Sequence, residues 1–119
     1  MKARIQSFTY AFKGIKILFS NETNARIQLI FTTFTLLGGF LLGLSKMEWI
    51  IVIVCCSMVL AAEAMNTAIE KLADLVDPEH NPKIAVVKDL SAGAVLICSL
   101  GAFIIGVIIF APKLIKVLT

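Results

Sequence analysis

The sequence predicts an all-α integral membrane protein with an N-terminal amphipathic surface helix and three transmembrane helices. Of its 119 residues, 59% are hydrophobic and only 16% carry a charge, against about 25% charged residues in soluble domains. The mean hydropathy is +0.94. The apolar residues gather in three long segments, and a chain of this length is at most one domain. We therefore expect a single membrane-embedded domain over residues 1–119.

Residues 1–20 are predicted to form the surface helix. Apolar side chains recur there at spacings of three and four, and the segment contains basic residues but no acidic ones. The apolar positions are Ile5, Phe8, Ala11, Phe12, Ile15, Leu18 and Phe19. Such a helix lies in the membrane interface with its apolar face down. A soluble helix packed on a core is the alternative, which we disfavour because the chain offers little soluble core.

The first span is predicted at about 27–45. The polar segment 20–26 before it is rich in capping residues, so a new helix is expected to start there. The 19 uncharged residues of the span make about 28 Å of helix, enough for a hydrocarbon core of about 30 Å. Gly39 and Gly43 form a Gly-x-x-x-Gly pair, which favours close helix packing. Residues 46–48 are interpreted as a short turn.

The second and third spans are predicted at about 49–69 and 90–111. Trp49 opens the second span, where interfacial aromatic residues usually lie. Pro112 is expected to end the third span. The polar stretch 70–89 between the two spans contains two prolines and is interpreted as a loop.

Basic residues are unequally shared between the two sides of the three spans. One side holds eight of them: Lys2, Arg4, Lys13, Lys16, Arg26, Lys71, Lys83 and Lys88. The other side holds Lys46, Lys113 and Lys116. The positive-inside rule then puts the N-terminus and the 70–89 loop in the cytoplasm. No cleavable signal peptide is expected, because the N-terminus lacks a compact hydrophobic segment that ends in small residues.

The cysteines and the single histidine do not indicate a metal site. Cys55, Cys56 and Cys98 lie in apolar runs without metal-ligand spacing, so they are interpreted as small buried side chains in a reducing setting. His80 alone cannot build a metal site and is interpreted as a solvated loop residue. No nucleic-acid partner is expected for a chain whose net charge is only +3.

Glu63, Asn66 and Glu70 are the polar residues around which the chain is organised. Their spacing puts them on one side of a helix, about 10 Å from end to end. An ionisable group inside a span, or at its edge, is costly and by default marks a functional site that faces protein or water. The alternative is that both glutamates only mark the cytoplasmic end of the span and lie in water.

Polar residues also gather at the predicted cytoplasmic face, and their types favour phosphoryl transfer. Glu22 and Glu70 are candidate Mg²⁺ ligands, because magnesium takes one or two protein carboxylates and leaves other positions to phosphate and water. Lys88 with Asp89 offers a point charge for phosphate and a further acceptor. Glu63 is deeper and less solvated, as expected of a general base for an alcohol that itself lies in the membrane. The sequence contains neither a Walker loop nor a protein-kinase signature.

Motifs along nearly the whole chain are those of one family. They are Tyr10-Ala11-Phe12-Lys13-Gly14, Asn21-Glu22, Glu63-x-x-Asn66-Thr67-Ala68-Ile69-Glu70, Asp74, and Lys88-Asp89 leading into Gly93-Ala94-Val95. On these residues the chain resembles the small prokaryotic integral-membrane diacylglycerol kinases, a family that includes undecaprenol kinases. The resemblance implies an ATP- and Mg²⁺-dependent lipid kinase in the bacterial inner membrane. It also implies a homotrimer whose active sites form between neighbouring subunits.

The resemblance further implies roles for individual residues. Glu63 matches the catalytic base, and Glu22 and Glu70 match the ligands of the metal that accompanies ATP. The positions matched to ATP binding are Tyr10, Glu22, Glu70, Glu79, His80, Asn81, Lys88 and Asp89, with Asn66 as a supporting polar residue. Glu63, Trp49 and Ala92 are assigned to the lipid substrate. The segment Leu90-Ser91-Ala92-Gly93 is more similar to the undecaprenol-kinase branch, which favours undecaprenol over diacylglycerol.

Two other classes of function compete with a kinase. In an ion- or proton-translocating subunit, Glu63 would be a relay group. Against this, the polar residues cluster at one face, and the third span has no ionisable partner beyond its first turn. In a small scaffold, the acidic loop would bind a partner protein. A scaffold leaves the register of Glu63, Asn66 and Glu70 unexplained.

Overall fold

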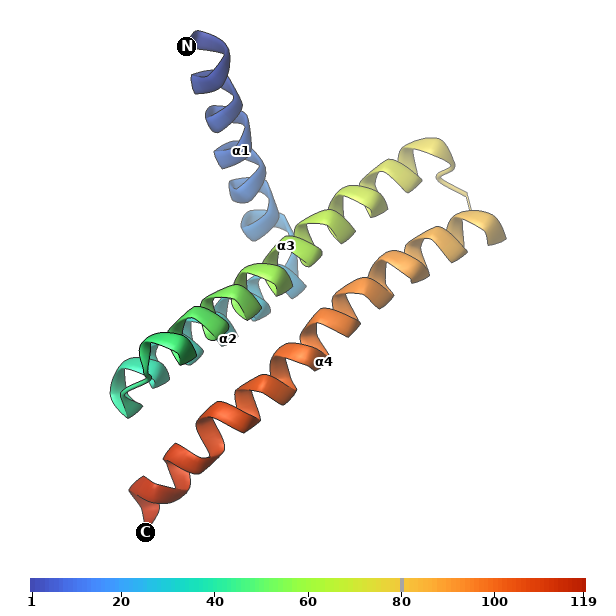
Figure 1. Ribbon diagram of the computed structural model, residues 1–119. Coiled ribbons are helices and arrows are strands. Elements are labelled where there is room, and N and C mark those ends of the chain that lie inside the picture. Colours follow the sequence, from blue (N-terminus) through green and yellow to red (C-terminus); the bar gives the residue numbers. More distant parts are fainter. Residues whose placement is uncertain (80) are drawn as a thin grey trace.

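The computed structural model describes residues 1–79 and 81–119, and this part of the chain folds into four helices (Figure 1). They are α1 (Lys2–Asn21), α2 (Thr23–Leu42), α3 (Lys46–Val76) and α4 (Pro82–Leu118). Three of them, α2, α3 and α4, are long and apolar enough to cross a membrane. The structure therefore confirms the predicted fold class of a surface helix followed by three spans.

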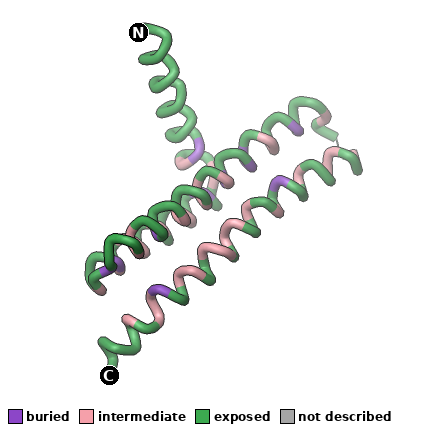
Figure 2. Tube along the Cα trace, viewed as in Figure 1, coloured by how far each residue is buried: buried purple, intermediate pink, exposed green. Residues whose placement is uncertain are grey.

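The bundle is built on α3 and α4, which run side by side as a long antiparallel pair (Figure 1). α2 packs along the N-terminal half of α3. α1 leaves the bundle at a steep angle, and its buried residue, Leu18, lies near its C-terminal end (Figure 2). The joint between α1 and α2 is a single extended residue, Glu22, with φ −107° and ψ 114°. This joint therefore brings a carboxylate to the place where α1 meets the bundle.

Of the Gly39 and Gly43 pair that was expected to favour close helix packing, only Gly39 lies at a close contact in the described structure. α2 ends at Leu42, and Gly43 is its C-cap in the left-handed region, with φ +72°. That conformation favours glycine because it has no Cβ. A Cβ on Gly39 would lie 2.8 Å from Cη2 of Trp49 and 2.9 Å from Cδ1 of Leu44. Gly39 thus leaves space for the ring of Trp49, in the first turn of α3.

The predicted turn at 46–48 is instead the first turn of α3. Ser45 caps the helix: its side chain accepts a hydrogen bond from the Glu48 backbone N–H, and the Glu48 side chain accepts one from the Ser45 N–H. This reciprocal pair satisfies two backbone donors that a helix start leaves open. Lys113 of α4 lies 3.1 Å from the Glu48 carboxylate, which ties the far ends of α3 and α4 together.

Most of the predicted loop 70–89 is also helical. α3 continues to Val76, and α4 begins at Pro82. Proline is tolerated at this first helical position, because a backbone N–H there would have no partner within the helix. Asn81 caps α4 by accepting from the Lys83 backbone N–H. The interpretation of the whole stretch 70–89 as a loop was therefore wrong, because polar residues on these two helices do not interrupt them.

Pro112 does not end α4, which runs on to Leu118. The proline removes one hydrogen-bond donor from the helix. Membrane helices tolerate such a loss, because neighbouring groups satisfy the freed carbonyl.

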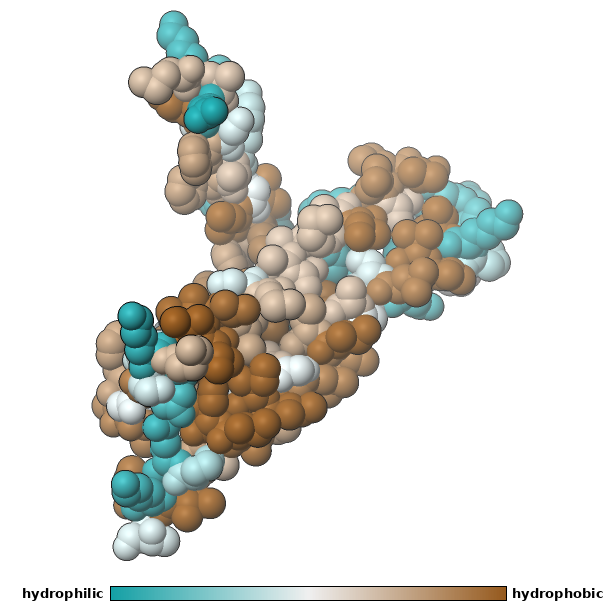
Figure 3. Space-filling view, viewed as in Figure 1, coloured by the Kyte–Doolittle hydropathy of each residue, from teal (hydrophilic) through white to brown (hydrophobic). Residues whose placement is uncertain are grey.

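The apolar surface faces outward. The buried apolar cluster is small and is made of Leu44, Val52 and Ile109, with Trp49 and Phe110 partly buried against it. Most other large hydrophobic side chains are exposed, and Figure 2 shows exposed residues along every helix. Figure 3 shows apolar residues over the middle of the bundle, with hydrophilic residues towards its two ends. Such an outside suits a hydrocarbon solvent.

Candidate active site

Glu63 is buried between α2 and α3. Only 3% of its surface is exposed, although it lies in an apolar segment of a candidate span. The side chain of Gln28, on α2, donates from Nε2 to Glu63 Oε2 at 3.4 Å. No other hydrogen bond reaches Glu63 from the described side chains. A buried carboxylate with one neutral donor retains the capacity to accept a proton.

Asn66 and Glu70 continue the polar face of α3 towards its C-terminal end. Asn66 Nδ2 donates to Glu70 Oε1 at 3.2 Å, so the amide holds this carboxylate. Asn66 and its neighbour Thr67 are buried, with 7% and 6% exposed. Asn66 Oδ1 and Thr67 Oγ1 have no partner among the described residues. This part of α3 therefore presents unused hydrogen-bonding capacity beside two carboxylates.

Glu22 joins the same region from the α1–α2 joint. Lys71 Nζ lies 3.9 Å from Glu22 Oε1, and Lys71 directly follows Glu70. Glu22 and Glu70 both act electrostatically on Glu63. The structure thus brings together three of the predicted site residues, from the joint and from α3.

The carboxylates of Glu22, Glu63 and Glu70 come from two places in the fold, the α1–α2 joint and α3. No set of three or more His, Cys, Asp or Glu side chains in the described ranges is placed to hold one metal ion. Glu22 and Glu70, near the end of the bundle, suit Mg²⁺, which needs only one or two protein carboxylates when phosphate and water complete its shell. Glu63 lies seven residues, about two helical turns, before Glu70 on α3.

The helix lengths indicate the depth of each carboxylate. α2 has 20 residues, about 30 Å, so it only just crosses a hydrocarbon core. If α2 crosses the bilayer, its N-cap residue, Glu22, lies at one edge of the hydrocarbon core. Gln28 lies about 9 Å further along α2, and Glu63 is bonded to it. In that arrangement Glu63 is expected inside the apolar layer, and Glu70 is expected near its edge.

Lys88 is held by an acidic partner that sequence reasoning left outside the site. Its Nζ donates to Asp74 Oδ1 across the α3–α4 hairpin, and both side chains are at least a third exposed. Asp89 is exposed. The pair forms because α3 and α4 both extend beyond the predicted spans, and that extension was not expected.

The other residues assigned to the nucleotide are not joined to the carboxylates by any hydrogen bond or ion pair in the described part of the chain. Tyr10 is 65% exposed on α1, with Lys13 Nζ 5.8 Å from its ring centroid. The Glu79 N–H and Asn81 Nδ2 both donate to the Asp77 carboxylate. His80 lies outside the described residues.

Trp49 and Ala92 do not meet Glu63 within one chain. Trp49 packs at 4.9 Å between ring centroids against Phe40. It is 14 residues before Glu63 on α3, about 21 Å along the helix axis. Ala92 is exposed on α4, one turn beyond Lys88. Their assignment to the lipid substrate stays a prediction.

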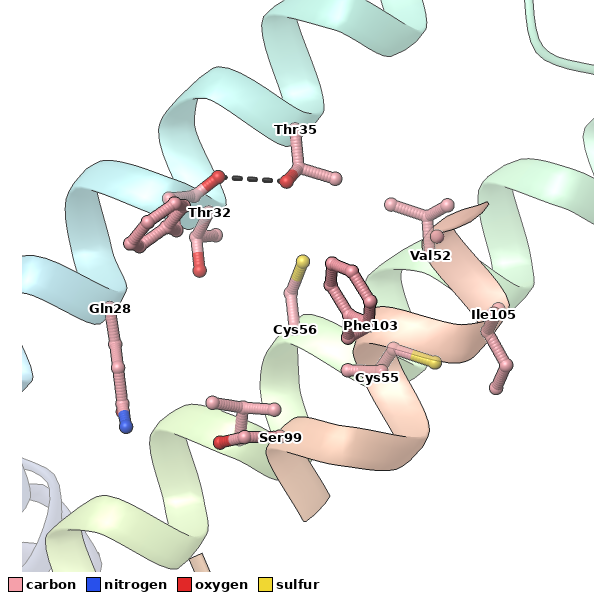
Figure 4. A pocket seen from close by; sticks show the side chains of 13 residues that line it. Gln28, Thr32, Thr35, Val52, Cys55, Cys56, Ser99, Phe103 and Ile105 are labelled. Atoms are coloured by element: carbon pink, nitrogen blue, oxygen red, sulfur yellow. Dashed lines mark hydrogen bonds between the residues drawn. The ribbon is translucent and has the colours of Figure 1, made fainter. Parts of the chain in front are cut away.

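Gln28 was missed by sequence reasoning. It lines a largely apolar cavity of about 370 Å³ between α2, α3 and α4, which Figure 4 shows from close by. The signal was present, because an amide inside an otherwise apolar span is costly unless it has a partner.

Comparison with known proteins identifies the family of this chain. A family model described as "Prokaryotic diacylglycerol kinase" matches residues 9–110. An undecaprenol kinase of Bacillus subtilis (strain 168) is 37% identical over 109 residues, covering 92% of this chain and 89% of the relative. A diacylglycerol kinase of Haemophilus influenzae is 31% identical over 108 residues, covering 89% and 92%. Because the match extends over most of its length, the chain belongs to the prokaryotic diacylglycerol kinase family, a family of lipid kinases.

Proposed function

We propose that this chain transfers the γ-phosphate of ATP to the hydroxyl of a membrane lipid alcohol, with Glu63 as the general base. The observation that carries the proposal is the position of Glu63, which is 3% exposed and lies about 10 Å deeper than Glu70 along α3. A base at this depth reaches an alcohol that lies in the bilayer. Glu22, Glu70 and Lys88 stay at the edge, where a water-soluble nucleotide arrives.

The proposed reaction conserves atoms and charge. The lipid O–H bond breaks and its proton passes to the Glu63 carboxylate. The lipid oxygen forms a bond to the γ-phosphorus, and the bond from that phosphorus to the bridging oxygen of ADP breaks. A positioned base of this kind contributes about 10²- to 10⁴-fold to the rate.

Glu22 and Glu70 would hold Mg²⁺, which when bound neutralises phosphate charge. Asn66 orients Glu70 through its hydrogen bond, and Lys88 exchanges Asp74 for a phosphate oxygen. In this arrangement Mg²⁺ and Lys88 would each face a negatively charged group, which suits a site at the membrane edge.

The preferred lipid in this proposal is undecaprenol. The relative from Bacillus subtilis is named undecaprenol kinase, and it is 37% identical to this chain. The segment Leu90–Gly93 on α4 favours the same branch. Diacylglycerol is the competing alcohol, as in the name of the relative from Haemophilus influenzae.

The proposed enzyme is a homotrimer in the bacterial inner membrane, with its N-terminus and the α3–α4 hairpin turn in the cytoplasm. The excess of basic residues on that side supports this orientation. Support for shared sites comes from Tyr10, which is 65% exposed on a helix that projects from its own bundle (Figure 1). A neighbouring subunit is the surface that such a helix would meet.

The test uses purified protein in mixed micelles with γ-labelled ATP and Mg²⁺. Undecaprenol and a diacylglycerol are offered separately, and the variants Glu63→Gln and Glu48→Gln are run beside the wild type. Glu48 is a matched control, because it is a glutamate in the first turn of the same helix, 15 residues before Glu63. We expect labelled lipid from the wild type and Glu48→Gln, and a kcat lowered by about 10²- to 10⁴-fold in Glu63→Gln.

Two outcomes would contradict the proposal. Glu63→Gln working at the wild-type rate would remove the base from its role. A wild type that labels neither lipid and does not bind ATP would remove the kinase, and proton flux through proteoliposomes would then be measured. Faster labelling of diacylglycerol would reverse only the choice of lipid.

A further inference from the structure

We propose that Gln28 is the positioning residue that holds Glu63 in the orientation needed for proton transfer. This inference rests on the proposed function. Gln28 is the only amide in the apolar part of α2, and its side chain reaches across to α3, where Nε2 donates to Glu63 Oε2 at 3.4 Å. The neighbouring hydroxyls of Thr33 and Thr35 instead donate to backbone carbonyls of their own helix.

The hydrogen bond leaves one oxygen of the carboxylate free. Gln28 engages Oε2 of Glu63, and no described residue donates to Oε1. The orientation of the amide follows from chemistry, because the opposite orientation would set an amide oxygen against a carboxylate oxygen. Oε1 is therefore the atom that takes the proton of the lipid hydroxyl, with its direction set through Oε2.

A role in stability alone does not explain this glutamine. Its Oε1 atom is buried and has no partner among the described residues, and a buried acceptor without a partner destabilises a fold. Gln28 lines a largely apolar cavity, at one edge of which Figure 4 places it. A methionine of similar length would pack here without that penalty. The amide is thus retained at a disadvantage to the fold, which favours a role in the reaction.

A neutral donor suits the proposed base. An amide orients the carboxylate without neutralising its charge, whereas a lysine or arginine at this depth would form an ion pair with it. Gln28 is also on a different helix from Glu63, so the bond sets the carboxylate relative to α2 as well as α3. A group that acts through the base in this way affects kcat more than substrate binding.

The experiment compares Gln28→Met with the wild type and with Thr35→Val, a control on the same helix whose side chain also lines the cavity. We measure kcat, KM for ATP and KM for the lipid alcohol, together with the melting temperature in detergent. Gln28→Met is expected to lower kcat by roughly 10- to 100-fold. KM for ATP should change less than about 2-fold, and the melting temperature should stay the same or rise, because the unpaired oxygen is gone. Thr35→Val should keep the wild-type kcat.

A second comparison places Gln28→Met in the Glu63→Gln background. If Gln28 acts only through Glu63, the double variant is no slower than Glu63→Gln alone, because effects on one functional unit do not add. Gln28→Leu serves as the alternative apolar variant if Gln28→Met is not recovered as folded protein.

The possible failures can be told apart. A wild-type kcat in Gln28→Met overturns the inference and leaves the proposed function intact. A fall in melting temperature with an unchanged kcat per folded protein, or an equal further loss in the double variant, also overturns it. An inactive wild type overturns the proposed function first and the role of Gln28 with it.

Discussion

At the scale of single residues, the chemistry of the site depends on which group contacts each charged side chain. Glu63 has a neutral amide, Glu70 has Asn66, Glu22 has Lys71, and Lys88 has Asp74. Partners that are exposed contribute little to stability, typically below about 1 kcal/mol. These partners matter because they change how readily a charged side chain binds a ligand. A carboxylate that faces a lysine is a weaker ligand for an added cation.

Lys71→Met is therefore expected to strengthen the apparent binding of Mg²⁺. The lysine lies 3.9 Å from Glu22 and competes with the metal for that carboxylate. Because an exposed pair contributes at most about 1 kcal/mol, the Mg²⁺ concentration that gives half-maximal activity should fall by up to about 5-fold. It is measured by titrating Mg²⁺ at saturating ATP, with Lys83→Met as a control on the same side of the membrane. A rise in the half-maximal concentration would show that Lys71 assists the site instead of competing in it.

At the scale of elements, the ends of the helices decide how the site is held. α2 stops at a left-handed glycine, α3 starts in a capping box, and Trp49 then packs into the space beside Gly39. This end of the bundle has no predicted catalytic carboxylate. It fixes α2 against α3, and Gln28 and Glu63 can then meet further along the same two helices.

Gly39→Ala and Gly38→Ala test that fit. A Cβ on Gly39 would lie 2.8 Å from the Trp49 ring, whereas one on Gly38 would lie 3.6 Å from Phe110, an ordinary contact. Overpacking of this kind destabilises by about 1 to 3 kcal/mol, so Gly39→Ala should lower the melting temperature in detergent. Gly38→Ala should leave it unchanged or raise it slightly, because alanine favours helix by up to about 1 kcal/mol over glycine. Equal effects from both variants would show that the indole does not need the space at Gly39.

At the scale of the whole molecule, most of the apolar surface and part of the predicted site face outward. Large hydrophobic side chains are exposed on all four helices. Tyr10, Ala92 and Asp89 are exposed as well, while Glu63 is buried. A single chain thus holds the base and presents other site residues to its surroundings, as expected if neighbouring subunits complete the site.

Mixing two inactive variants tests whether neighbouring subunits share a site. Glu63→Gln and Lys88→Met subunits are each expected to be inactive, because they lack the base and a phosphate contact. If α4 of one subunit serves the base of the next, mixed oligomers contain some sites with both wild-type groups, and activity returns. The measurement is lipid phosphorylation after the two variants are unfolded together and refolded at varied ratios. Mixtures as inactive as either parent would place Glu63 and Lys88 in the site of a single chain.

The fold class and the main polar face could be predicted from the amino-acid sequence, because both depend on local patterns. Hydropathy over about 20 residues identifies a span, and helical spacing places Glu63, Asn66 and Glu70 on one side of α3. The same local patterns misplaced the ends of α3 and α4. The polar stretch 70–89 was interpreted as a loop, but α3 continues to Val76 and α4 begins at Pro82.

The side-chain contacts between helices could not be predicted from the sequence. The contacts of Gln28 with Glu63, Lys71 with Glu22, and Lys88 with Asp74 join residues 35, 49 and 14 positions apart. No periodicity within one helix encodes such pairs, since they depend on the relative rotation and translation of packed helices. The placement of α2 against α3 gives the buried Glu63 carboxylate a hydrogen-bond partner, Gln28. This contact makes Glu63 a candidate base whose carboxylate has a defined orientation.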